Sequence, residues 1–374
     1  MLIVDSGDLF IEKEDIPESF RAWTELKADL IGRIYTRTGI DALNVSETDL
    51  VLGIDFLKRM EKILDLPFVS ANLTDERNNP LFKPYIIKKV SGKSVGIFGV
   101  VGDTGEIVSK VKKITRGAVG VQDAIKSAES AVNDLAGKVD LIVALTHQGV
   151  GRDWVIAKRV PGIDVIIGGR DRQKITVPRE VGKTRIVQAG EKGQYLGLLQ
   201  ISFEPDGNKP LQNNLIPLGG NIADDTEIKS MTYEYQKQLA SLHGPGEKTQ
   251  EPISRSLTSC SQCHQKEFAA WKATKHARAY NALVNRGRQF DPDCLPCHTT
   301  RFEEVDGFIM KLQQEDLVHV QCESCHGQAS GHATAGKPIP SVKPKKEACI
   351  KCHTADRSPS FEKEYEGHLQ KIKH

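Results

Sequence analysis

A repeated five-residue motif, Cys-x-x-Cys-His, dominates the last third of this 374-residue chain. Four copies occur, and together they use all eight cysteines of the sequence. Two thiols three positions apart can form thioethers with the two vinyl groups on one porphyrin edge, and the histidine that follows can ligate the iron. The motif is therefore the attachment signature of a c-type haem. The copies are Cys260–His264, Cys294–His298, Cys322–His326 and Cys349–His353.

Two other uses of paired cysteines fit this pattern less well. A zinc site needs paired C-x-x-C units but gives no reason for a histidine after each one, and a dithiol redox motif is expected once, on a thioredoxin-like pattern. We therefore predict four covalently bound haem c groups. The thioether residues are Cys260, Cys263, Cys294, Cys297, Cys322, Cys325, Cys349 and Cys352, and the proximal iron ligands are His264, His298, His326 and His353.

The overall charge and hydropathy argue against two classes of partner. Charged residues make up 27 % of the chain, but the formal net charge is only +2, so no nucleic-acid footprint is indicated. No run approaches the ~18 apolar residues that a membrane span needs. We predict redox proteins as partners, as donor and acceptor, with an oligomer or a larger cytochrome assembly as a further possibility, no nucleic acid, and no membrane span in this chain.

The start of the sequence conflicts with the haem motifs. The run from Met1 to Val4 leads straight into Asp5, with no basic region and no cleavage site of a signal peptide. Haem c is nevertheless attached outside the cytoplasm. We expect an exported protein, periplasmic or extracellular, whose leader lies upstream of Met1.

The first 205 residues alternate between apolar strand-like runs and amphipathic helical patterns. Several of the strand-like runs are apolar on both faces, which suits a sheet that helices cover on each side. The fold class of this region is therefore α/β. The strands are expected at 2–4, 94–101, 141–145, 164–167, 185–188 and 196–203, and the helices at 16–36, 49–64 and 121–135.

Five stretches in this region resemble the 5'-nucleotidase type of calcineurin-like metallophosphoesterase. They match, in order and spacing, the family's V-D-A-G-D strand end, S-A-N strand, L-T-H-x-G strand end, the run into its G-H-x-H block, and its closing strand. The matching residues are Val4–Phe10, Val69–Leu73, Leu145–Gly149, Asp164–Gly169 and Ile186–Gly190. The resemblance implies a layered α/β metallophosphoesterase-like domain over about residues 1–240, in which Asp8 and His147 stand at metal-ligand positions.

The departures from that family weaken the expected metal site. The family's first strand, with an Asp-x-His ligand pair, would lie before Met1. Ser46–Asp49 stands where G-N-H-E is expected, and Gly169–Arg172 stands where G-H-x-H is expected. Guanidinium groups in place of imidazoles cannot ligate a cation and would repel one. With Asp8 and His147 as the ligands that remain, we predict no dinuclear metal site and a catalytically inactive domain that serves as scaffold or docking surface.

A helix and a linker separate this region from the haem motifs. Asp224–Leu242 carries apolar residues along one helical face, and the run His243–Gly246 ends that pattern. We expect three parts: a metallophosphoesterase-like domain at 1–222, a helix and linker at 223–256, and a tetrahaem domain at 257–374.

The tetrahaem region resembles the cytochrome c-554 family. The likeness lies in the long match Cys260–Leu283, which includes Trp271 and a T-x-H-A segment, and in the surroundings of the other three motifs: Asp293–His298 with Gly307–Phe308, Val320–Gly327, and Cys349–Phe361. It spans about residues 257–374. The resemblance implies a mainly α-helical multihaem cytochrome domain in which much of the core is porphyrin.

Two distal haem ligands are predicted on this basis. His276 lies twelve residues after His264, which is about 18 Å along a helix. That distance is too long for both to ligate one iron. In the resembling family the T-x-H-A histidine caps the third-motif haem, and the G-x-H histidine after motif three caps the first. The resemblance implies these roles for His276 and His332.

The remaining two haems leave alternatives open. The resemblance implies that His374, or else His368, caps the fourth-motif haem. The second-motif haem is open in that family, yet His319 lies nearby in this sequence. Ligation by His319 and an ordinary exposed or core histidine at that position are equal alternatives.

Three functions follow from these observations. The first is an exported tetrahaem electron-transfer protein. The second is a redox enzyme acting on a small nitrogen compound at a five-coordinate haem, and the third is a 5'-nucleotidase-like phosphoesterase with a fused cytochrome. The lost metal-ligand positions weigh against the third function, and the spin state of the haems distinguishes the first two.

Overall fold

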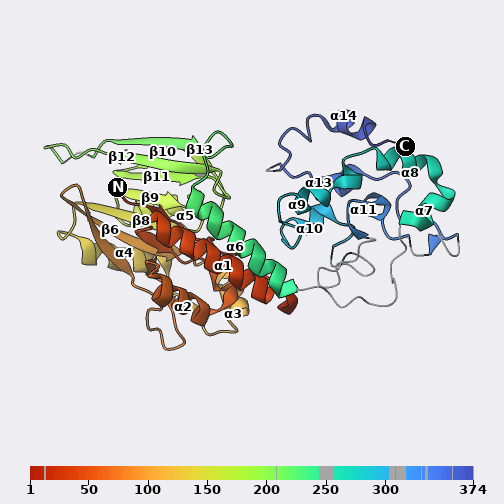
Figure 1. The fold of residues 1–374 in the computed structure, drawn as a ribbon. Helices are drawn as coiled ribbons and strands as arrows, with labels where there is room; N and C mark the ends of the chain where they lie inside the picture. Colours follow the sequence, from red (N-terminus) through yellow and green to blue (C-terminus); the bar gives the residue numbers. More distant parts are fainter. Residues whose placement is uncertain are drawn as a thin grey trace. The chain divides into compact units, whose positions relative to one another are not determined.

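The protein is described by a computed structural model, and its chain separates into two compact units, Met1–Met231 and Thr232–His374. Figure 1 shows the ribbon of the chain. The division falls nine residues beyond the boundary we predicted at 222 and lies inside helix α6 (Thr226–His243). The structure describes residues 1–11, 14–207, 209–243, 257–302, 308, 317–329, 331–332, 336–355 and 357–373.

A six-stranded sheet forms the centre of the first unit (Figure 1). Its strand order is β10-β11-β9-β8-β6-β5; the four inner strands are parallel, and the edge strands β5 and β10 pair antiparallel to their neighbours. The strands are β5 (Tyr85–Val90), β6 (Lys93–Val101), β8 (Leu141–His147), β9 (Val165–Gly168), β10 (Lys174–Val181) and β11 (Thr184–Ala189).

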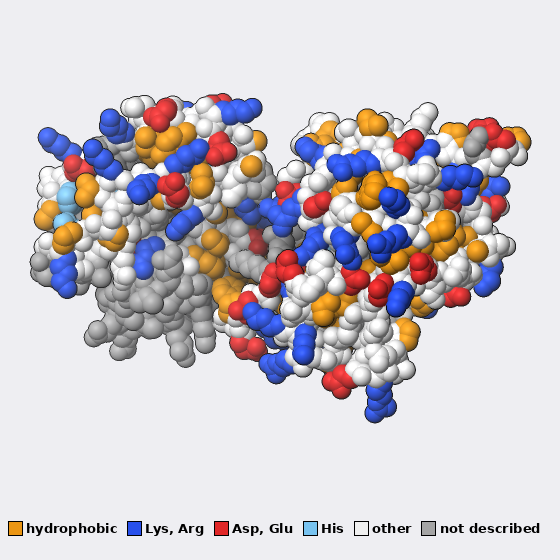
Figure 2. All heavy atoms as spheres, turned by 180° about the vertical axis from the view of Figure 1, so that it is seen from behind, with side chains coloured by type: hydrophobic (Ala, Val, Ile, Leu, Met, Phe, Trp, Pro, Cys, Tyr) orange, Lys and Arg blue, Asp and Glu red, His pale blue; other side chains and the backbone are white. Residues whose placement is uncertain are grey.

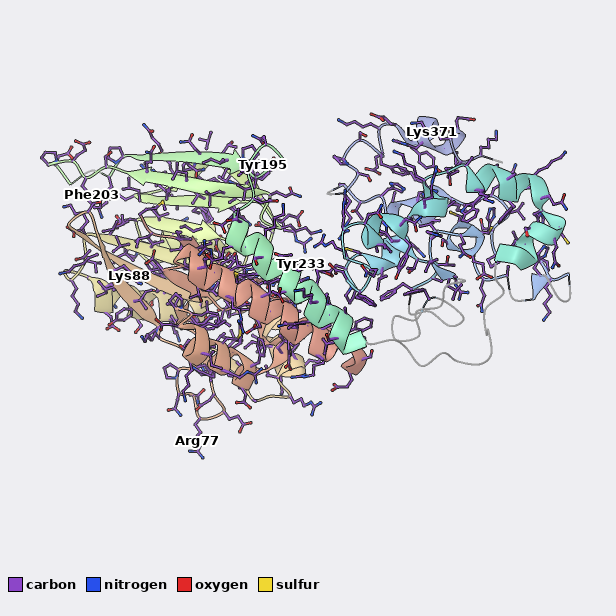
Figure 3. All side chains as sticks on the ribbon, viewed as in Figure 1. Arg77, Lys88, Tyr195, Phe203, Tyr233 and Lys371 are labelled. Atoms are coloured by element: carbon purple, nitrogen blue, oxygen red, sulfur yellow. The ribbon has the colours of Figure 1, made fainter. Side chains whose placement is uncertain are left out.

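A second, smaller sheet packs against the first. Its three parallel strands are β1 (Val4–Asp5), β2 (Ala42–Asn44) and β3 (Phe68–Val69). The Lys88 ammonium of β5 lies 3.2 Å from one carboxylate oxygen of Asp41 (Lys88 is labelled in Figure 3). The other oxygen of Asp41 accepts the Ile3 backbone N–H at 3.0 Å. This ion pair therefore connects the two sheets. The remaining strands form two antiparallel pairs. These are β4 (Leu73–Thr74) with β7 (Gly120–Val121), and β12 (Tyr195–Ile201) with β13 (Leu211–Pro217).

Helices cover the outer face of each sheet. Buried side chains from α1 (Glu18–Thr38), α2 (Ile54–Leu64) and α3 (Gly105–Ile114) share a cluster with the small sheet. Those of α4 (Ala124–Leu135) and α5 (Val150–Arg159) share one with the large sheet. A third cluster lies between the sheets. On β6, Phe98 and Val100 belong to the α4 side and Val95 and Ile97 to the inter-sheet side, as the two-residue repeat of a strand requires.

The predicted α/β class is confirmed, with one more layer than expected. Every predicted strand and helix of the first unit is present within a few residues. The segment predicted as one helix at 49–64 is divided into a 3-10 turn (Asp49–Leu52) and α2, because Gly53 between them has φ +91°. Instead of one sheet between helices, two stacked sheets lie between them. Our prediction missed α3, α5 and the strands β2, β3, β4, β5, β7, β10 and β13.

From Leu257 onward the described chain consists of short helices and loops. The first three haem motifs begin or end in a helical turn, and the fourth starts at the end of one. All three hydrophobic clusters found in the described residues belong to the first unit. The helices are α7 (Leu257–Cys263), α8 (Gln265–Lys272), η2 (His276–Arg278), α9 (Asn281–Val284), α10 (Leu295–His298), α11 (Cys322–His326), α13 (Lys346–Ile350) and α14 (Tyr365–Gln370).

The packing of β6 predicts an unequal response to two truncations. Phe98 is fully buried, whereas Ile87 on the paired strand β5 is 44 % exposed. We expect Phe98→Ala to lower the opening free energy of the large sheet by about 3–5 kcal/mol, because it leaves a cavity. Ile87→Ala should change it by less than about 1 kcal/mol. Hydrogen exchange of peptides from residues 93–101 measures both; equal protection in the two variants would contradict the assignment of the core.

Candidate functional site

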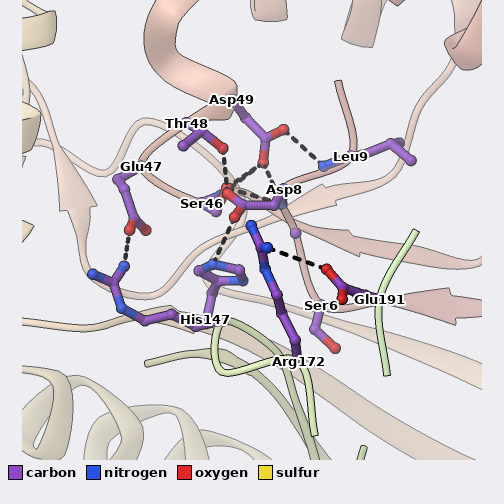
Figure 4. Close-up of polar contacts among 12 residues, drawn as sticks. Ser6, Asp8, Leu9, Ser46, Glu47, Thr48, Asp49, His147, Arg172 and Glu191 are labelled. Atoms are coloured by element: carbon purple, nitrogen blue, oxygen red, sulfur yellow. Dashed lines mark hydrogen bonds and ion pairs between the residues drawn. The ribbon is translucent and has the colours of Figure 1, made fainter. Parts of the chain in front are cut away.

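The residual phosphoesterase site lies where parallel strands of the two sheets end. Asp8 follows β1, Glu47 follows β2, His147 is the last residue of β8 and Arg170 follows β9. Carboxyl ends of parallel strands meet at one edge, which is where open α/β sheets bind ligands. The Ser6 hydroxyl donates to the Ile167 carbonyl at 3.1 Å and holds the loop after β1 against β9. Figure 4 shows the resulting cluster.

Asp8 is the best-connected group of this cluster. Its backbone adopts a left-handed conformation, with φ +59°. One carboxylate oxygen accepts hydrogen bonds from the hydroxyls of Ser46 (2.5 Å) and Thr48, and the other lies 3.1 Å from His147 Nε2 (Figure 4). Burial by itself would raise the pKa of Asp8, but the hydrogen bond and positive charge of His147 outweigh it and lower that pKa. Asp8 is therefore an anion held by an imidazole and two hydroxyls.

Asp49 fixes the loop that carries Asp8. Its buried carboxylate accepts the backbone N–H groups of Asp8, Leu9 and Phe10 at 3.0–3.2 Å, and one of its oxygens lies 2.7 Å from the hydroxyl oxygen of Ser46. Burial and the neighbouring charge of Asp8 raise the pKa of Asp49 to about 6. Our sequence analysis treated Asp49 only as part of a lost metal block; the structure gives it a clear role in holding the site loop.

Glu47 was missed as a site residue, although it lies in the altered block that we singled out. Its side chain is 1 % exposed, and it forms ion pairs with Arg170 and, at 3.5 Å, with Lys110. The Arg170 guanidinium also reaches Glu106 at 3.4 Å. The second oxygen of Glu47 is buried and has no hydrogen-bond partner in the described structure. Glu47 is thus a buried carboxylate that two cations neutralise.

The donor groups correct our expectation that no dinuclear metal site would remain. One ligand atom each from Asp8, Glu47 and His147 lies within 4.8 Å of the others. Three protein ligands of this kind can hold a divalent cation. Nδ1 of the His147 imidazole is buried and has no hydrogen-bond partner in the described structure. The block Ser46–Asp49 therefore keeps a ligand, because Glu47 brings a carboxylate to it.

The two arginines that replace the expected imidazoles behave differently. Arg170 points at Glu47, where its guanidinium occupies space beside the three donor groups. Arg172 pairs instead with Glu191, at 3.2 Å (Figure 4). Both have positive φ, 75° and 57°. Only Arg170 therefore competes directly with a cation for a ligand of this cluster.

The four haem motifs come together in the second unit although they are spread over 94 residues of sequence. The thiols of Cys260 and Cys322 lie close enough to shift one another's pKa, and so do those of Cys297 and Cys352. Helix α11, which carries motif three, contacts helix α13, in which motif four begins. Motif one therefore adjoins motif three, motif three adjoins motif four, and motif four adjoins motif two.

Hydrogen bonds at Nδ1 orient several of the predicted iron ligands. The Nδ1 atoms of His298, His326 and His332 lie 2.6–2.8 Å from the backbone carbonyls of Ala279, Ser341 and Lys337, respectively. In each case the imidazole donates from Nδ1, which leaves Nε2 bare, and this is the tautomer of a metal-bound histidine. His353 Nδ1 lies 3.2 Å from the Ser358 hydroxyl. His298, His326 and His332 therefore fit an iron ligand at Nε2, whereas the Ser358 hydroxyl can donate to or accept from His353 Nδ1.

The distal candidates are placed unequally. The rings of His264 and His332 lie 6.1 Å apart, which brings together the pair that we predicted for the first haem. His276, predicted to cap the third-motif haem, has its ring 6.1 Å from His353 of the fourth motif. His374 lies outside the described residues.

The other two distal candidates have competing contacts. His368 stacks on Phe361 at 5.2 Å, and its Nε2 lies 3.5 Å from a carboxylate oxygen of Glu364. His319 Nδ1 accepts the Tyr280 backbone N–H at 3.1 Å. A neutral imidazole that accepts at Nδ1 carries its proton on Nε2, so His319 is not prepared as an Nε2 ligand.

Comparison with known proteins separates the two units. The family model "Cytochrome c554 and c-prime" matches residues 259–327. Over 64 % of this chain, the sequence is 29 % identical to the trifunctional nucleotide phosphoesterase protein YfkN of Bacillus subtilis and 25 % identical to the 5'-nucleotidase of Bos taurus. The chain spans only 18 % and 44 % of the length of these two proteins.

Solved structures give the fold of the same region. A 5'-nucleotidase precursor from Thermus thermophilus matches 64 % of this chain and 50 % of its own with TM-score 0.53 and 24 % identity. The calcineurin-like phosphoesterase YfkN matches 65 % of this chain and 85 % of its own with TM-score 0.54 and 22 % identity. The chain joins a metallophosphoesterase-like domain to a cytochrome c554-like region. The predicted fusion of the two is confirmed.

One further property of the chain concerns membranes. Among the described helices of the metallophosphoesterase-like domain and the cytochrome c554-like region, none combines the length and apolarity needed to cross a bilayer.

Arg170 provides a test of the metallophosphoesterase-like site. We expect Arg170→Ala to lower the dissociation constant for Mn²⁺ at least about tenfold relative to the unaltered protein. Without the Arg170 guanidinium the buried Glu47 carboxylate loses an ion pair, which costs about 3–5 kcal/mol. A bound cation would offset part of that cost. A tenfold change in affinity corresponds to about 1.4 kcal/mol. Isothermal titration with MnCl₂ measures this effect.

Arg172→Ala is the matched control, because Arg172 pairs with Glu191. Its Mn²⁺ affinity should equal that of the unaltered protein, and adding Glu47→Gln to Arg170→Ala should abolish the gain. An unchanged affinity in Arg170→Ala would contradict the competition between Arg170 and a cation.

Proposed function

We propose that this protein is an exported electron carrier that moves electrons through four covalently attached haem c groups. The observation that carries the proposal is the gathering of all four C-x-x-C-H motifs in the second unit, with thiols of different motifs close together and the Cys352 thiol of motif four 3.9 Å from the Pro296 carbonyl of motif two. Each thiol is the attachment point of one porphyrin edge. Neighbouring thiols therefore bring porphyrin edges together, and this is the arrangement that lets an electron pass between haems.

The thiol contacts also support a route. Motif one adjoins motif three through Cys260 and Cys322, motif three adjoins motif four through helices α11 and α13, and motif four adjoins motif two through Cys352 and Cys297. An electron would travel in the order one, three, four, two. The two ends of this route, motifs one and two, are where we expect the donor and the acceptor to dock.

The haem groups fit the residues that surround them. Bound haem supplies one-electron redox chemistry, and the chain contributes its position and its ligands. His298 and His326 present Nε2 while Nδ1 donates to a backbone carbonyl. Among the described residues of the second unit few apolar side chains are buried, so the porphyrins would supply much of its apolar core.

Export and partners belong to the same proposal. Attachment of haem c takes place outside the cytoplasm, so we place the protein in the periplasm or outside the cell. Lys and Arg side chains are interspersed with Asp and Glu on the face that Figure 2 shows, which suits redox proteins as partners better than nucleic acid. The metallophosphoesterase-like domain would serve as scaffold or docking surface.

Two enzymatic functions are the alternatives. A redox enzyme acting on a small nitrogen compound needs an open haem, and the engaged Nδ1 of His319 favours an open second-motif haem. A 5'-nucleotidase-like phosphoesterase needs metal, and the cluster of Asp8, Glu47 and His147 favours that reading. Turnover of a nucleoside monophosphate with Mn²⁺ would support the second alternative, and turnover of a nitrogen oxide would support the first.

Haem content and spin state test the electron-carrier proposal. Protein purified from a periplasmic fraction should carry the added mass of four haems. Its ferric EPR spectrum separates the carrier from the redox enzyme, because a high-spin fraction favours the enzyme. His319→Ala should leave the high-spin fraction unchanged, because His319 does not ligate iron. Fewer than four attached haems would sink the proposal, and a high-spin signal that appears only in His319→Ala would show that His319 closes the second haem.

A further inference from the structure

Positive charge is concentrated in the segment that directly follows motif one. Residues 265–290 hold six Lys and Arg residues and a single acidic residue, Glu267. Residues 291–316, which carry motif two, hold seven Asp and Glu residues and two basic ones. The sequences around the two ends of the proposed electron route therefore have opposite charge.

Three of these cations form a row at three-residue spacing. Lys272 is the last residue of α8, Lys275 precedes the 3-10 turn η2, and Arg278 ends that turn. The Arg278 backbone N–H donates to the Lys275 carbonyl at 3.0 Å, and residues three apart in such a turn lie above one another. All three side chains are exposed, and none has an ion-pair partner in the part of the chain that the structure describes. We call these three residues the basic row.

The segment that carries the basic row is fixed to the rest of the second unit by its aromatic side chains. Trp271 Nε1 donates to the Val320 carbonyl at 2.8 Å, and the Trp271 ring lies 5.7 Å from that of Phe268. Both aromatic side chains are half-buried. The exposed residues nearest to the row in sequence are small: Ala269, Ala270 and Ala273. Another protein can therefore approach α8 closely beside the cations.

Motif one itself reaches the surface next to this row. Cys263 is exposed, whereas the other seven cysteines are buried or half-buried. His264 is the residue that precedes α8, so motif one leads directly into the helix on which the row begins. A haem attached at Cys263 would have an edge near the surface, as electron exchange with another protein requires.

We propose that the basic row, Lys272, Lys275 and Arg278, is the docking surface for an acidic redox protein at the motif-one end of the electron route. This rests on the proposed function and deepens it by naming the charge of one partner. Carboxylates on the partner would meet cations that have no internal partner. Such complementarity steers the encounter and raises association rates by about 10–1,000-fold at low salt.

An anionic membrane is the other acidic surface that a row of cations could contact. Peripheral membrane segments combine cations with large apolar side chains that insert between the lipids. Within residues 265–278, all of which the structure describes, no large apolar side chain is exposed. The row therefore fits a protein partner better than a lipid surface.

Charge reversal in the full-length holoprotein tests the docking surface. The probe is a reduced plant-type ferredoxin, a small acidic protein that donates one electron, and stopped-flow absorbance measures haem reduction. We expect the triple variant Lys272→Glu, Lys275→Glu, Arg278→Glu to lower the second-order rate constant at least about tenfold at low salt. The loss should shrink to less than about twofold in about 0.5 M NaCl, because salt screens charges beyond a few ångströms.

A second triple variant controls for net charge. Lys343→Glu, Lys363→Glu and Lys371→Glu make the same change of charge at exposed residues around motif four, which lies inside the route. Its rate constant should fall by less than about threefold, because steering depends on charge near the docking surface. Equal losses in the two triple variants, or no loss in the basic-row variant, would overturn the proposal.

Two further probes separate the row from other uses of its charge. Reduction by hexaammineruthenium(II), a small cation, should not slow in the basic-row variant; slowing with both reductants would show that the row serves the haems and would overturn the docking role. The unaltered protein should not bind phosphatidylserine vesicles through the row. Vesicle binding that the basic-row variant loses, with an unchanged ferredoxin rate, would assign the row to a membrane instead.

The outcomes also separate this inference from the proposed function. Four attached haems in each variant, measured as the pyridine haemochrome, show that the protein has matured. If the basic-row variant fails to accumulate, the neutral triple Lys272→Gln, Lys275→Gln, Arg278→Gln replaces it and should show a smaller, salt-sensitive loss. An unaltered protein that carries no haem and accepts electrons from neither reductant would overturn the proposed function, whereas an altered docking rate concerns the row alone.

Discussion

Attachment of four porphyrins to eight thiols is the constraint on which the second unit depends. The three hydrophobic clusters found in the described residues all belong to the first unit, where strands such as β6 and β8 bury both faces. From Leu257 onward the helices are eight residues or shorter, too short to be stable without tertiary packing. Covalent haem would bring both the apolar surface and the cross-links between distant segments, so folding and haem attachment are expected to be coupled.

Sequence patterns predicted the parts of the fold that depend on local periodicity. The buried strands β6 and β8 were found because their apolar residues continue over both faces. The edge strand β10 was missed because half of its residues are exposed and polar, and β3, which has only two residues, was indicated by the resemblance at Val69–Leu73 but not by periodicity. The second sheet could not be predicted either. Its strands are separated in sequence by long segments, and their pairing is not written in any local pattern.

The two sites illustrate the same limit. The C-x-x-C-H residues are contiguous, so their chemistry could be read directly from the sequence. The Glu47–Arg170 pair joins residues 123 positions apart. Arg170 stands where the resembling family has an imidazole, and only the fold shows that its guanidinium contacts the Glu47 carboxylate. The placement of His276 beside His353 likewise depends on how loops fold around the motifs. Patterns identified the types of ligand, whereas the structure was needed to pair them.

Charge explains how the metallophosphoesterase-like domain keeps its fold despite an altered site. An isolated buried carboxylate is costly, and removing one member of a buried ion pair usually destabilises a protein strongly. Here Glu47 is neutralised by Arg170 and Lys110, Asp8 by His147, and Asp49 by a row of backbone N–H groups. Each acidic group thus has an internal partner that a divalent cation would otherwise supply. The edge can therefore remain folded and acidic without depending on a metal, which is compatible with a domain retained for the surface that it presents.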